Sequence, residues 1–303
     1  MTFTVSPSDA GKRVDLFLRD KMPLYSRARL QTWIRGGRVM AGGVALKSSY
    51  LLRGEETIEV EPEALPPLKA EPEALPLKIL YEDEDVVAVD KPAGMVVHAG
   101  AGCRTGTLVN ALLHRFSTLS GVGGDLRPGI VHRLDRFTSG VILAARHDLA
   151  HRRLAAQFAS RSTEKVYIAL LHGSLAKNEG RIEKPIARDP IKRIRMTSRL
   201  ERGRAALTEY RVLRRYERGF TLVEVRIHTG RTHQIRVHFA SLGHPVVGDQ
   251  LYGAPAKIKN RPPLHRYFLH ARCIRFEHPM TGKPTTIECP LPAELERWLE
   301  GLL

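Results

Sequence analysis

The stretch GIVHRLDRFTSG, residues 129 to 140, places one carboxylate among basic side chains. Asp135 follows His132 and Arg133 and precedes Arg136, and the apolar run from Val141 to Ala145 begins directly after the stretch. A carboxylate among guanidinium groups stays ionised, as a nucleophile or a charge-stabilising group must. An ordinary Asp/Arg turn before a strand would have the same composition, so these residues alone leave both interpretations open.

The composition of the whole chain indicates a soluble protein with a polyanionic partner. Its 303 residues, 43% hydrophobic and 26% charged, suggest about two globular domains. The net charge of +16 favours nucleic acid, because Lys and Arg that bind phosphates release condensed counterions. A membrane is a poorer fit, since no apolar run could span a bilayer. Three cysteines without CxxC spacing, and no signal-peptide pattern at the start, predict a cytoplasmic protein.

Residues 1 to 60 are predicted to form a small module of their own. A helical pattern begins at Val14, and Ser26 can cap a second helix that ends at Gly36-Gly37. Short strands fit residues 38 to 40 and 57 to 60, with Gly42-Gly43 as a turn.

Four arginines gather around the second predicted helix and suggest a surface for phosphate groups: Arg27, Arg29, Arg35 and Arg38. A solvated basic helix face would have the same pattern. The order of RVDLFL, SRARLQTWIRGGRVMAGG and GEETIEVE resembles the S4 RNA-binding domain, which implies a helix-helix-hairpin platform for structured RNA. This chain has Ala41-Gly42-Gly43 where that family usually has valine-asparagine-glycine, and Gly54-Glu55 in place of glycine-aspartate.

The segment that follows nearly repeats itself, with EPEALPPLK from Glu61 and EPEALPLK from Glu71. Its proline and glutamate content predicts a semi-rigid acidic linker over residues 61 to 78. Residues 1 to 90 carry 12 of the 48 Lys and Arg and 15 of the 32 Asp and Glu, so the rest of the chain has a net charge of +19. The large domain, residues 79 to 303, should therefore contact RNA itself.

Apolar and alternating segments predict the elements of the large domain. We expect strands at residues 86–89, 96–98, 141–145, 164–172 and 221–228. Helices should begin at the caps Thr107 and Asp148, and a third should follow Thr229-Gly230-Arg231.

Two further side chains are candidates for a site. Tyr167 points away from the apolar face of its predicted strand and could line a cleft, although a buried tyrosine in a sheet is the simpler explanation. Arg236 lies off the apolar face of its predicted helix, where it could pair with a buried carboxylate or be solvated. No metal site is expected, because His233 and His238 would lie about 140° apart around one helix. A hydrolase pair of Ser139 with a histidine is disfavoured, since GxSxG is missing.

Several long motifs in order carry a second resemblance. GIVHRLDRFTSG, DKPAGMVVH, EKVYIAL, HTGRTHQIRVHFASLGHPVVGDQLYG, LHA at residues 269–271 and HPMTGKP at residues 278–284 together resemble the RluA-type pseudouridine synthases. The resemblance covers the chain from Tyr81 to its end, and Phe137 departs from the acidic residue common in relatives. It implies an α+β fold: a mixed, largely antiparallel sheet with flanking helices and a central cleft, preceded by the S4-like module. The alternating strands, typical of sheets with one open face, fit that fold.

The resemblance also implies a reaction and assigns roles. Asp135 would be the catalytic aspartate, Tyr167 the aromatic that stacks on the base, and Arg236 the basic partner of the aspartate. Arg133, with His132 beside it, would contact RNA and fill the space left when the target uridine leaves its stack. No metal or organic cofactor is implied. The expected enzyme is a monomer that isomerises uridines to pseudouridine in RNA, most simply in large-subunit (23S) ribosomal RNA. The alternatives are a tRNA pseudouridine synthase and a non-catalytic RNA-binding ribosome-assembly factor.

Overall fold

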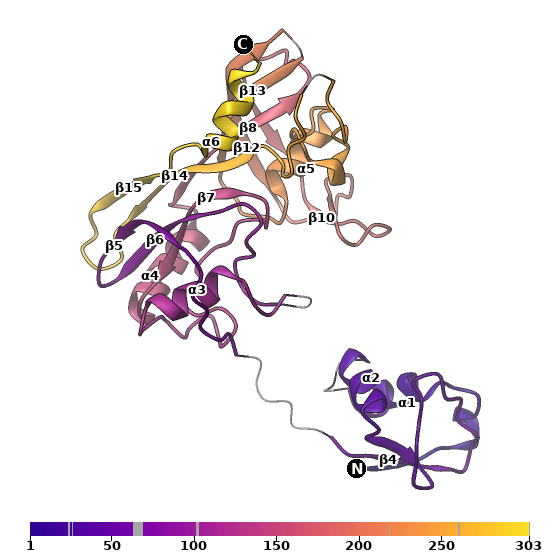
Figure 1. Ribbon diagram of the computed structural model, residues 1–303. Coiled ribbons are helices and arrows are strands. Elements are labelled where there is room, and N and C mark those ends of the chain that lie inside the picture. Colours follow the sequence, from indigo (N-terminus) through magenta and orange to yellow (C-terminus); the bar gives the residue numbers. More distant parts are fainter. Residues whose placement is uncertain are drawn as a thin grey trace. The chain divides into compact units, whose positions relative to one another are not determined.

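The computed structural model describes residues 1–23, 25, 27–62, 69–100, 103–217, 219–259 and 261–302. It divides into two compact units, Met1–Pro67 and Leu68–Leu303 (Figure 1). Within the described residues, no helix has the length and apolar character needed to cross a membrane.

The N-terminal unit packs two helices against an antiparallel sheet. The sheet has the order β1-β4-β2-β3, with β1 Thr2–Thr4, β2 Val39–Ala41, β3 Val44–Ala45 and β4 Thr57–Val60. The helices are α1 Val14–Lys21 and α2 Arg27–Arg35, preceded by the 3-10 turn η1 Pro7–Asp9. The predicted helices and both strands are present, although the first strand begins one residue later than expected and Gly42-Gly43 connects it to β3. The predicted cap, Ser26, lies outside the described residues.

A buried carboxylate joins the two helices of this unit. Asp15 on α1 is fully buried and accepts hydrogen bonds from Arg13, Arg27 and Gln31 at 2.8 to 3.2 Å. Burial alone would raise the pKa of Asp15, but these donors lower it to about 2. Arg27, predicted to face RNA, therefore has a structural partner.

The C-terminal unit is built on one large, mostly antiparallel sheet. The strand order is β5-β6-β7-β14-β8-β13-β12-β9, and β15 pairs with β14 at the side of this path. The strands are β5 Lys78–Glu82, β6 Val86–Lys91, β7 Ser139–Ala145, β8 Glu164–His172, β9 Glu179–Glu183, β12 Leu207–Tyr216, β13 Phe220–Ile227, β14 Leu269–Glu277 and β15 Pro284–Glu288. A separate hairpin consists of β10 Ala187–Arg188 and β11 Met196–Thr197.

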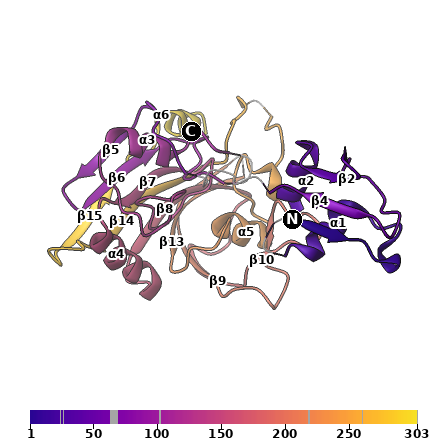
Figure 2. The same ribbon diagram turned by 90° about the horizontal axis from the view of Figure 1, so that it is seen from below.

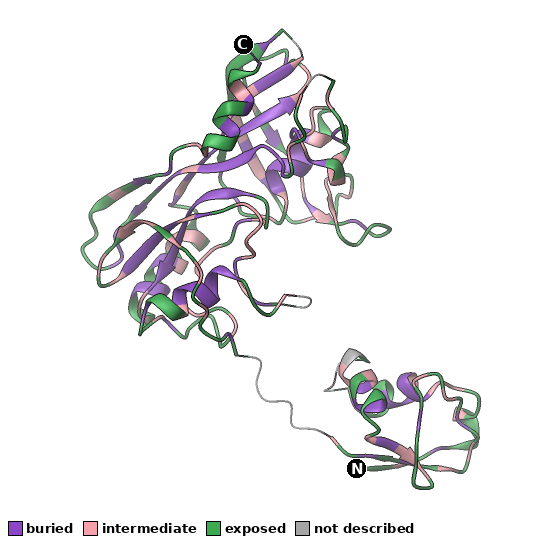
Figure 3. Ribbon diagram, viewed as in Figure 1, coloured by how far each residue is buried: buried purple, intermediate pink, exposed green. Residues whose placement is uncertain are grey.

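Helices cover the two halves of this sheet (Figure 2). They are α3 Leu108–Arg115, α4 Asp148–Ser160, α5 Gln234–Ser241 and α6 Ala293–Glu300, with the 3-10 turn η2 Gln250–Tyr252. α4 packs on β7, whereas α5 packs on β12. The central strands are the most deeply buried part of the unit (Figure 3). The predicted strands at 86–89, 141–145, 164–172 and 221–228 are confirmed, and Thr107 caps α3 as expected.

Two local predictions in this unit were wrong. Residues 96–98 do not form a strand, and Val96 makes only one isolated bridge, to Thr107. The chain turns just before them, because the Lys91 ammonium binds the carbonyls of both Pro92 and Met95. The N-cap of α4 is His147, whose Nδ1 accepts the N–H of Ala150. The carboxylate of Asp148 is instead engaged by the hydroxyl of Ser120 at 2.8 Å.

The second copy of the acidic repeat also differs from the spacer expected there. Ala70 is buried, and its N–H donates to the carbonyl of Asp125. Glu73 accepts the N–H of Gly106 at 2.9 Å, and the Asn110 amide donates to the carbonyl of Glu71. Residues 69–75 therefore belong to the C-terminal unit. Asp125, Gly106 and Asn110 of that unit supply hydrogen-bond partners for their backbone groups and for the Glu73 carboxylate.

The contact between β7 and β14 is parallel and requires a glycine. It joins Ser139 to His270 and Gly140 to Ala271. Gly140 has a φ of +112°, and a Cβ at this position would lie 2.2 Å from the Ala271 carbonyl oxygen. An L side chain is therefore excluded both by conformation and by space.

Gly140→Ala is expected to destabilise the C-terminal unit by more than the roughly 1–3 kcal/mol of backbone strain alone. Chemical denaturation followed by circular dichroism measures this loss. Gly282→Ala is the matched control, because Gly282 also has a positive φ, of +69°, but faces open space. Equal losses in the two variants would contradict the role given to the Ala271 contact.

Candidate active site

Asp135 lies on a turn that backbone contacts hold in place. Lys91 is fully buried, and its ammonium donates to the carbonyls of Pro92, Met95 and Arg136. Gly94 and Arg136 exchange two further bonds, of 2.8 and 3.0 Å. Burial lowers the pKa of Lys91 to about 7. In the charged form, each of the three ammonium N–H groups has one of these carbonyls as its hydrogen-bond acceptor. The turn that carries Asp135 is thus fixed to the end of β6.

Arg236 on α5 connects Asp135 to a second carboxylate. Its Nη1 donates to Asp135 Oδ2 at 3.0 Å, while its Nε and Nη2 bind both oxygens of Asp249 at 2.6 and 3.0 Å. Asp249 is almost completely buried, whereas the Asp135 side chain is 16% exposed. Burial would lower the pKa of Arg236, but the hydrogen bonds to Asp249 and the two negative charges raise it. The sequence-based pairing of Arg236 with a carboxylate is found, with Asp249 as an additional partner.

Aromatic rings surround this charge cluster. Tyr167 on β8 is 7% exposed, and burial followed by the negative charge of Asp135 raises the pKa of its hydroxyl. The Arg236 guanidinium lies 4.1 Å from the ring centre of Tyr267 and 5.0 Å from that of Tyr252. All three tyrosines therefore present neutral hydroxyls and apolar ring surface near Asp135.

Two adjoining cavities meet at Asp135. One, of about 460 Å³, contains Tyr167, Ile227 and Leu269, and the other, of about 690 Å³, contains Phe137 and Tyr267. Of the described residues that line the first cavity, Asp135 is the only acidic one, among the cationic side chains Arg133, Arg161, Lys165, Arg204, Arg231 and Arg236. A planar ring bound beside Asp135 would have apolar walls and a positive field suited to phosphate groups.

His233 is a neighbour of Asp135 that the sequence did not single out for this site. Its Nε2 lies 4.0 Å from Asp135 Oδ2, and its backbone is left-handed, with a φ of +57°. The Tyr252 hydroxyl oxygen accepts the N–H of Met196, so its proton is available for His233 Nδ1 at 2.8 Å. Burial lowers the pKa of His233. We infer a neutral ring with its proton on Nε2, facing the space beside Asp135.

The other residues considered from the sequence have different surroundings. Arg133 is exposed and lines both cavities. His132, predicted to contact RNA, lines the first cavity; its Nε2 accepts the N–H of Leu143, its ring stacks on Phe158, and burial lowers its pKa to about 3. Its ring therefore has a structural contact.

Ser139 does lie 2.8 Å from a histidine nitrogen, Nδ1 of His270, but both side chains are buried. Arg266 donates to the same Ser139 hydroxyl, and Nε2 of His270 lies 3.1 Å from the Cys289 carbonyl. A nucleophile without access to a cavity cannot attack a substrate, so this pair fits a structural role.

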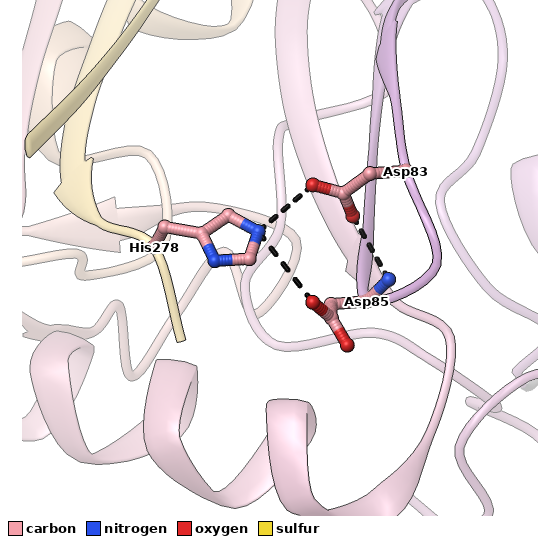
Figure 4. Close-up of side chains that lie close together, drawn as sticks. All are labelled: Asp83, Asp85 and His278. Atoms are coloured by element: carbon pink, nitrogen blue, oxygen red, sulfur yellow. Dashed lines mark hydrogen bonds and ion pairs between the residues drawn. The ribbon is translucent and has the colours of Figure 1, made fainter. Parts of the chain in front are cut away.

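Among the described residues, one cluster has the composition of a metal site: Asp83, Asp85 and His278 (Figure 4). His278 Nδ1 accepts the N–H groups of Met280 and Thr281, so its Nε2 carries a proton and donates to Asp83 at 2.8 Å. The other Asp83 oxygen accepts the N–H groups of Asp85 and Val86. These bonds use the atoms that would bind a metal, so the cluster fits a structural link between the turns of β5–β6 and β14–β15.

Comparison with known proteins identifies the family. The sequence model of RNA pseudouridylate synthases matches residues 85–241, which include Asp135, Tyr167 and Arg236. The chain belongs to this family. It is therefore an RNA pseudouridine synthase.

Relatives and solved structures agree with this membership. The chain is 45% identical to an uncharacterized RNA pseudouridine synthase of Aquifex aeolicus, with 95% of this chain and 94% of the relative covered. It is 41% identical to ribosomal large subunit pseudouridine synthase D of Xanthomonas campestris, over 98% and 91% of the two chains. The structure of human RNA pseudouridylate synthase domain containing 1 superimposes with a TM-score of 0.58 at 26% identity, over 80% of this chain and 97% of that one.

The sequence predicted three members of the cluster and did not predict four others: Asp249, Tyr252, Tyr267 and His233. Asp249 lies in GDQLYG and Tyr267 before LHA, and both reach Arg236 only through the fold. The sequence suggested His233 only as a possible metal ligand. His233 lies three residues before Arg236, and this spacing could have indicated that the two side chains lie on the same side of a helix.

Asp249→Asn is expected to lower the single-turnover rate of pseudouridine formation roughly 100-fold, because a misoriented Arg236 would misplace Asp135. The free energy of unfolding should fall by about 3–5 kcal/mol, as when one partner of a buried ion pair is removed. Asp15→Asn is the matched control: it removes an equally buried, arginine-bound carboxylate from the other unit. An equal loss of rate in both variants would contradict the specific role of Asp249.

Proposed function

We propose that Asp135 is the catalytic aspartate of a pseudouridine synthase that acts on large-subunit ribosomal RNA. The observation that carries the proposal is the Asp135 carboxylate, held 3.0 Å from Arg236 in a cavity that also contains Tyr167. Asp135 remains partly exposed, so a substrate can reach it. The two cavities that meet there form the central cleft of the catalytic unit in this proposal.

The cluster supplies what the isomerisation needs. The bond between C1′ and N1 of the target uridine breaks, the uracil turns within the cavity, and C5 bonds to C1′. The proton leaves C5 and N1 gains one, so no redox partner is required. Asp135 provides the charge that assists bond cleavage, Tyr167 holds the uracil by stacking, and Arg236 keeps the Asp135 carboxylate oriented.

The target uridine must leave its stack to reach Asp135. Arg133 is exposed beside both cavities, and no ion pair or hydrogen bond within the described part of the chain holds it elsewhere. We therefore assign Arg133 to the space that the uridine vacates.

The choice of ribosomal RNA rests on two supports. Relatives named ribosomal large subunit pseudouridine synthase D match nearly the whole chain, including its N-terminal unit. That unit has the two helices and sheet expected of an S4-like RNA-binding module, with Arg29 half-buried and Arg35 exposed on α2. In this proposal Arg29, Arg35 and Arg38 face RNA phosphates, while Arg27 holds Asp15.

Asp135→Asn is expected to abolish pseudouridine formation in a purified-RNA assay while RNA affinity stays within about twofold, because the amide keeps the shape and loses the charge. Tyr167→Ala should lose activity strongly, since stacking contributes about 1–3 kcal/mol per base. Tyr167→Phe should retain it if the ring is what matters. Normal turnover by Asp135→Asn would rule out the catalytic assignment.

Carbodiimide mapping of pseudouridine in total RNA tests the substrate. A deletion strain should lack one or more pseudouridines in large-subunit rRNA, and wild-type protein, but not Asp135→Asn, should restore them. Missing sites in tRNA would replace the rRNA proposal and keep the enzyme. If wild-type and deletion strains have identical maps, the chain acts without catalysis, as an RNA-binding assembly factor would.

Arg29→Ala combined with Arg35→Ala is expected to weaken binding to the RNA fragment that mapping identifies. The slope of log affinity against log salt should become shallower by about one for each phosphate that the variant no longer binds. Arg19→Ala on α1 is the control, because Arg19 is an exposed arginine bound to Asp20 and outside the proposed surface. An unchanged slope in the double variant would remove α2 from the RNA interface.

A further inference from the structure

The hairpin of β10 and β11 exposes two large apolar side chains. Ile191 is 89% exposed and Ile194 77% exposed, the highest values among the large hydrophobic residues that the structure describes. The hairpin projects from the C-terminal unit near α5 (Figure 1). Exposure of two isoleucine side chains to water at one tip is unfavourable, so burying them against a partner would lower the free energy.

The tip has a defined shape without a partner. Asp189 Oδ1 accepts the N–H groups of Ile191 and Lys192 at 2.9 Å each, and Oδ2 accepts Nε of Arg195 at 2.6 Å. The backbone N–H of Arg195 donates to the carbonyl of Lys192. Hydrogen bonds to these residues lower the pKa of Asp189 to about 2, so it remains ionised at neutral pH. Both isoleucines are thus held outward by a closed turn.

The charge around the tip identifies the partner as a polyanion. Residues 188–204 contain seven Lys and Arg against two Asp and Glu. Lys192 and Arg193 lie between the two isoleucines and are exposed. Apolar side chains flanked by cations fit nucleic acid, where apolar groups insert between bases while cations bind the neighbouring phosphates.

The base of the hairpin is fixed to the active site. The N–H of Met196 on β11 donates to the Tyr252 hydroxyl at 2.8 Å, and Tyr252 in turn binds His233 beside Asp135. Arg204, which follows the hairpin, lines the same cavity as Asp135 and Tyr167. RNA held by the tip would therefore be positioned relative to the catalytic carboxylate.

We propose that this tip is a wedge that packs Ile191 and Ile194 against RNA bases close to the target uridine. Lys192 and Arg193 bind the adjacent phosphates. The wedge stabilises the opened RNA while the uridine occupies the cavity, so it matters most for substrates whose target is stacked. This inference rests on the proposed function, because it takes RNA bound at Asp135 as the substrate.

The test compares Ile191→Ser/Ile194→Ser with the wild-type chain on two substrates. One is the folded RNA fragment that contains the mapped uridine, and the other is a short single-stranded RNA with the same sequence around it. We expect the single-turnover rate at subsaturating enzyme to fall about tenfold on the folded RNA and to change little on the single strand. Leu213→Ser is the control, since Leu213 is an exposed apolar residue on β12 of the same unit.

A fluorescence measurement of base unstacking distinguishes loss of the wedge from other defects of the variant. With 2-aminopurine next to the target uridine, wild-type binding should raise fluorescence as the base unstacks, and the double variant should not. Equal rates and equal fluorescence for wild type and double variant would overturn the wedge. A defect on ribosomal particles but not on naked RNA would also overturn it, in favour of a protein partner. If the wild-type chain itself makes no pseudouridine in the folded RNA, the proposed function fails instead.

Discussion

The arrangement around Arg236 depends on one guanidinium shared by two carboxylates. Asp249 takes two of its hydrogen bonds and is nearly inaccessible, whereas Asp135 takes one and remains partly exposed. The three groups together carry one net negative charge, and the neutral His233 leaves it unchanged. Of these two carboxylates, Asp135 is the one that lines the cavity with Tyr167. A cationic cavity surrounds it, which stabilises the charge without adding a second close ion pair.

Backbone constraints place Asp135 where Arg236 can reach it. Lys91 ties the carbonyl of Arg136 to the turn after β6, and Gly140 lets β7 approach β14 directly after the Asp135 turn. Neither residue touches the cavity that contains Tyr167. The HRLD part of the motif therefore carries the carboxylate that lines the cavity, whereas the TSG part allows the close packing of two strands. Phe137, whose role the sequence left open, packs edge-on against Tyr267 with the Arg136 guanidinium over its ring.

Local patterns predicted most of the strands and helices, because alternation in β8 and β13 and the Thr107 cap depend on neighbours in sequence. Tyr167 and Arg236 could be found since each departs from the apolar face of its own element. Asp249, Tyr252 and Tyr267 could not, because only the long-range approach of η2 and the segment before β14 brings them to α5. The surroundings of His132 and of the second acidic repeat could not be predicted for the same reason: each has a hydrogen bond to a residue distant in sequence.

The place of β14 in the sheet has a consequence for how the protein is made. This strand lies between β7 and β8, yet it is synthesised after α5 and about a hundred residues after β8. The β5–β7 half and the β8–β13 half of the sheet can join only when residues 269–277 have left the ribosome. Asp135 belongs to the first half, and Tyr167 and Arg236 to the second. The proposed active site can therefore form only after residues 269–277 have been synthesised, and closing such distant contacts makes this step slow.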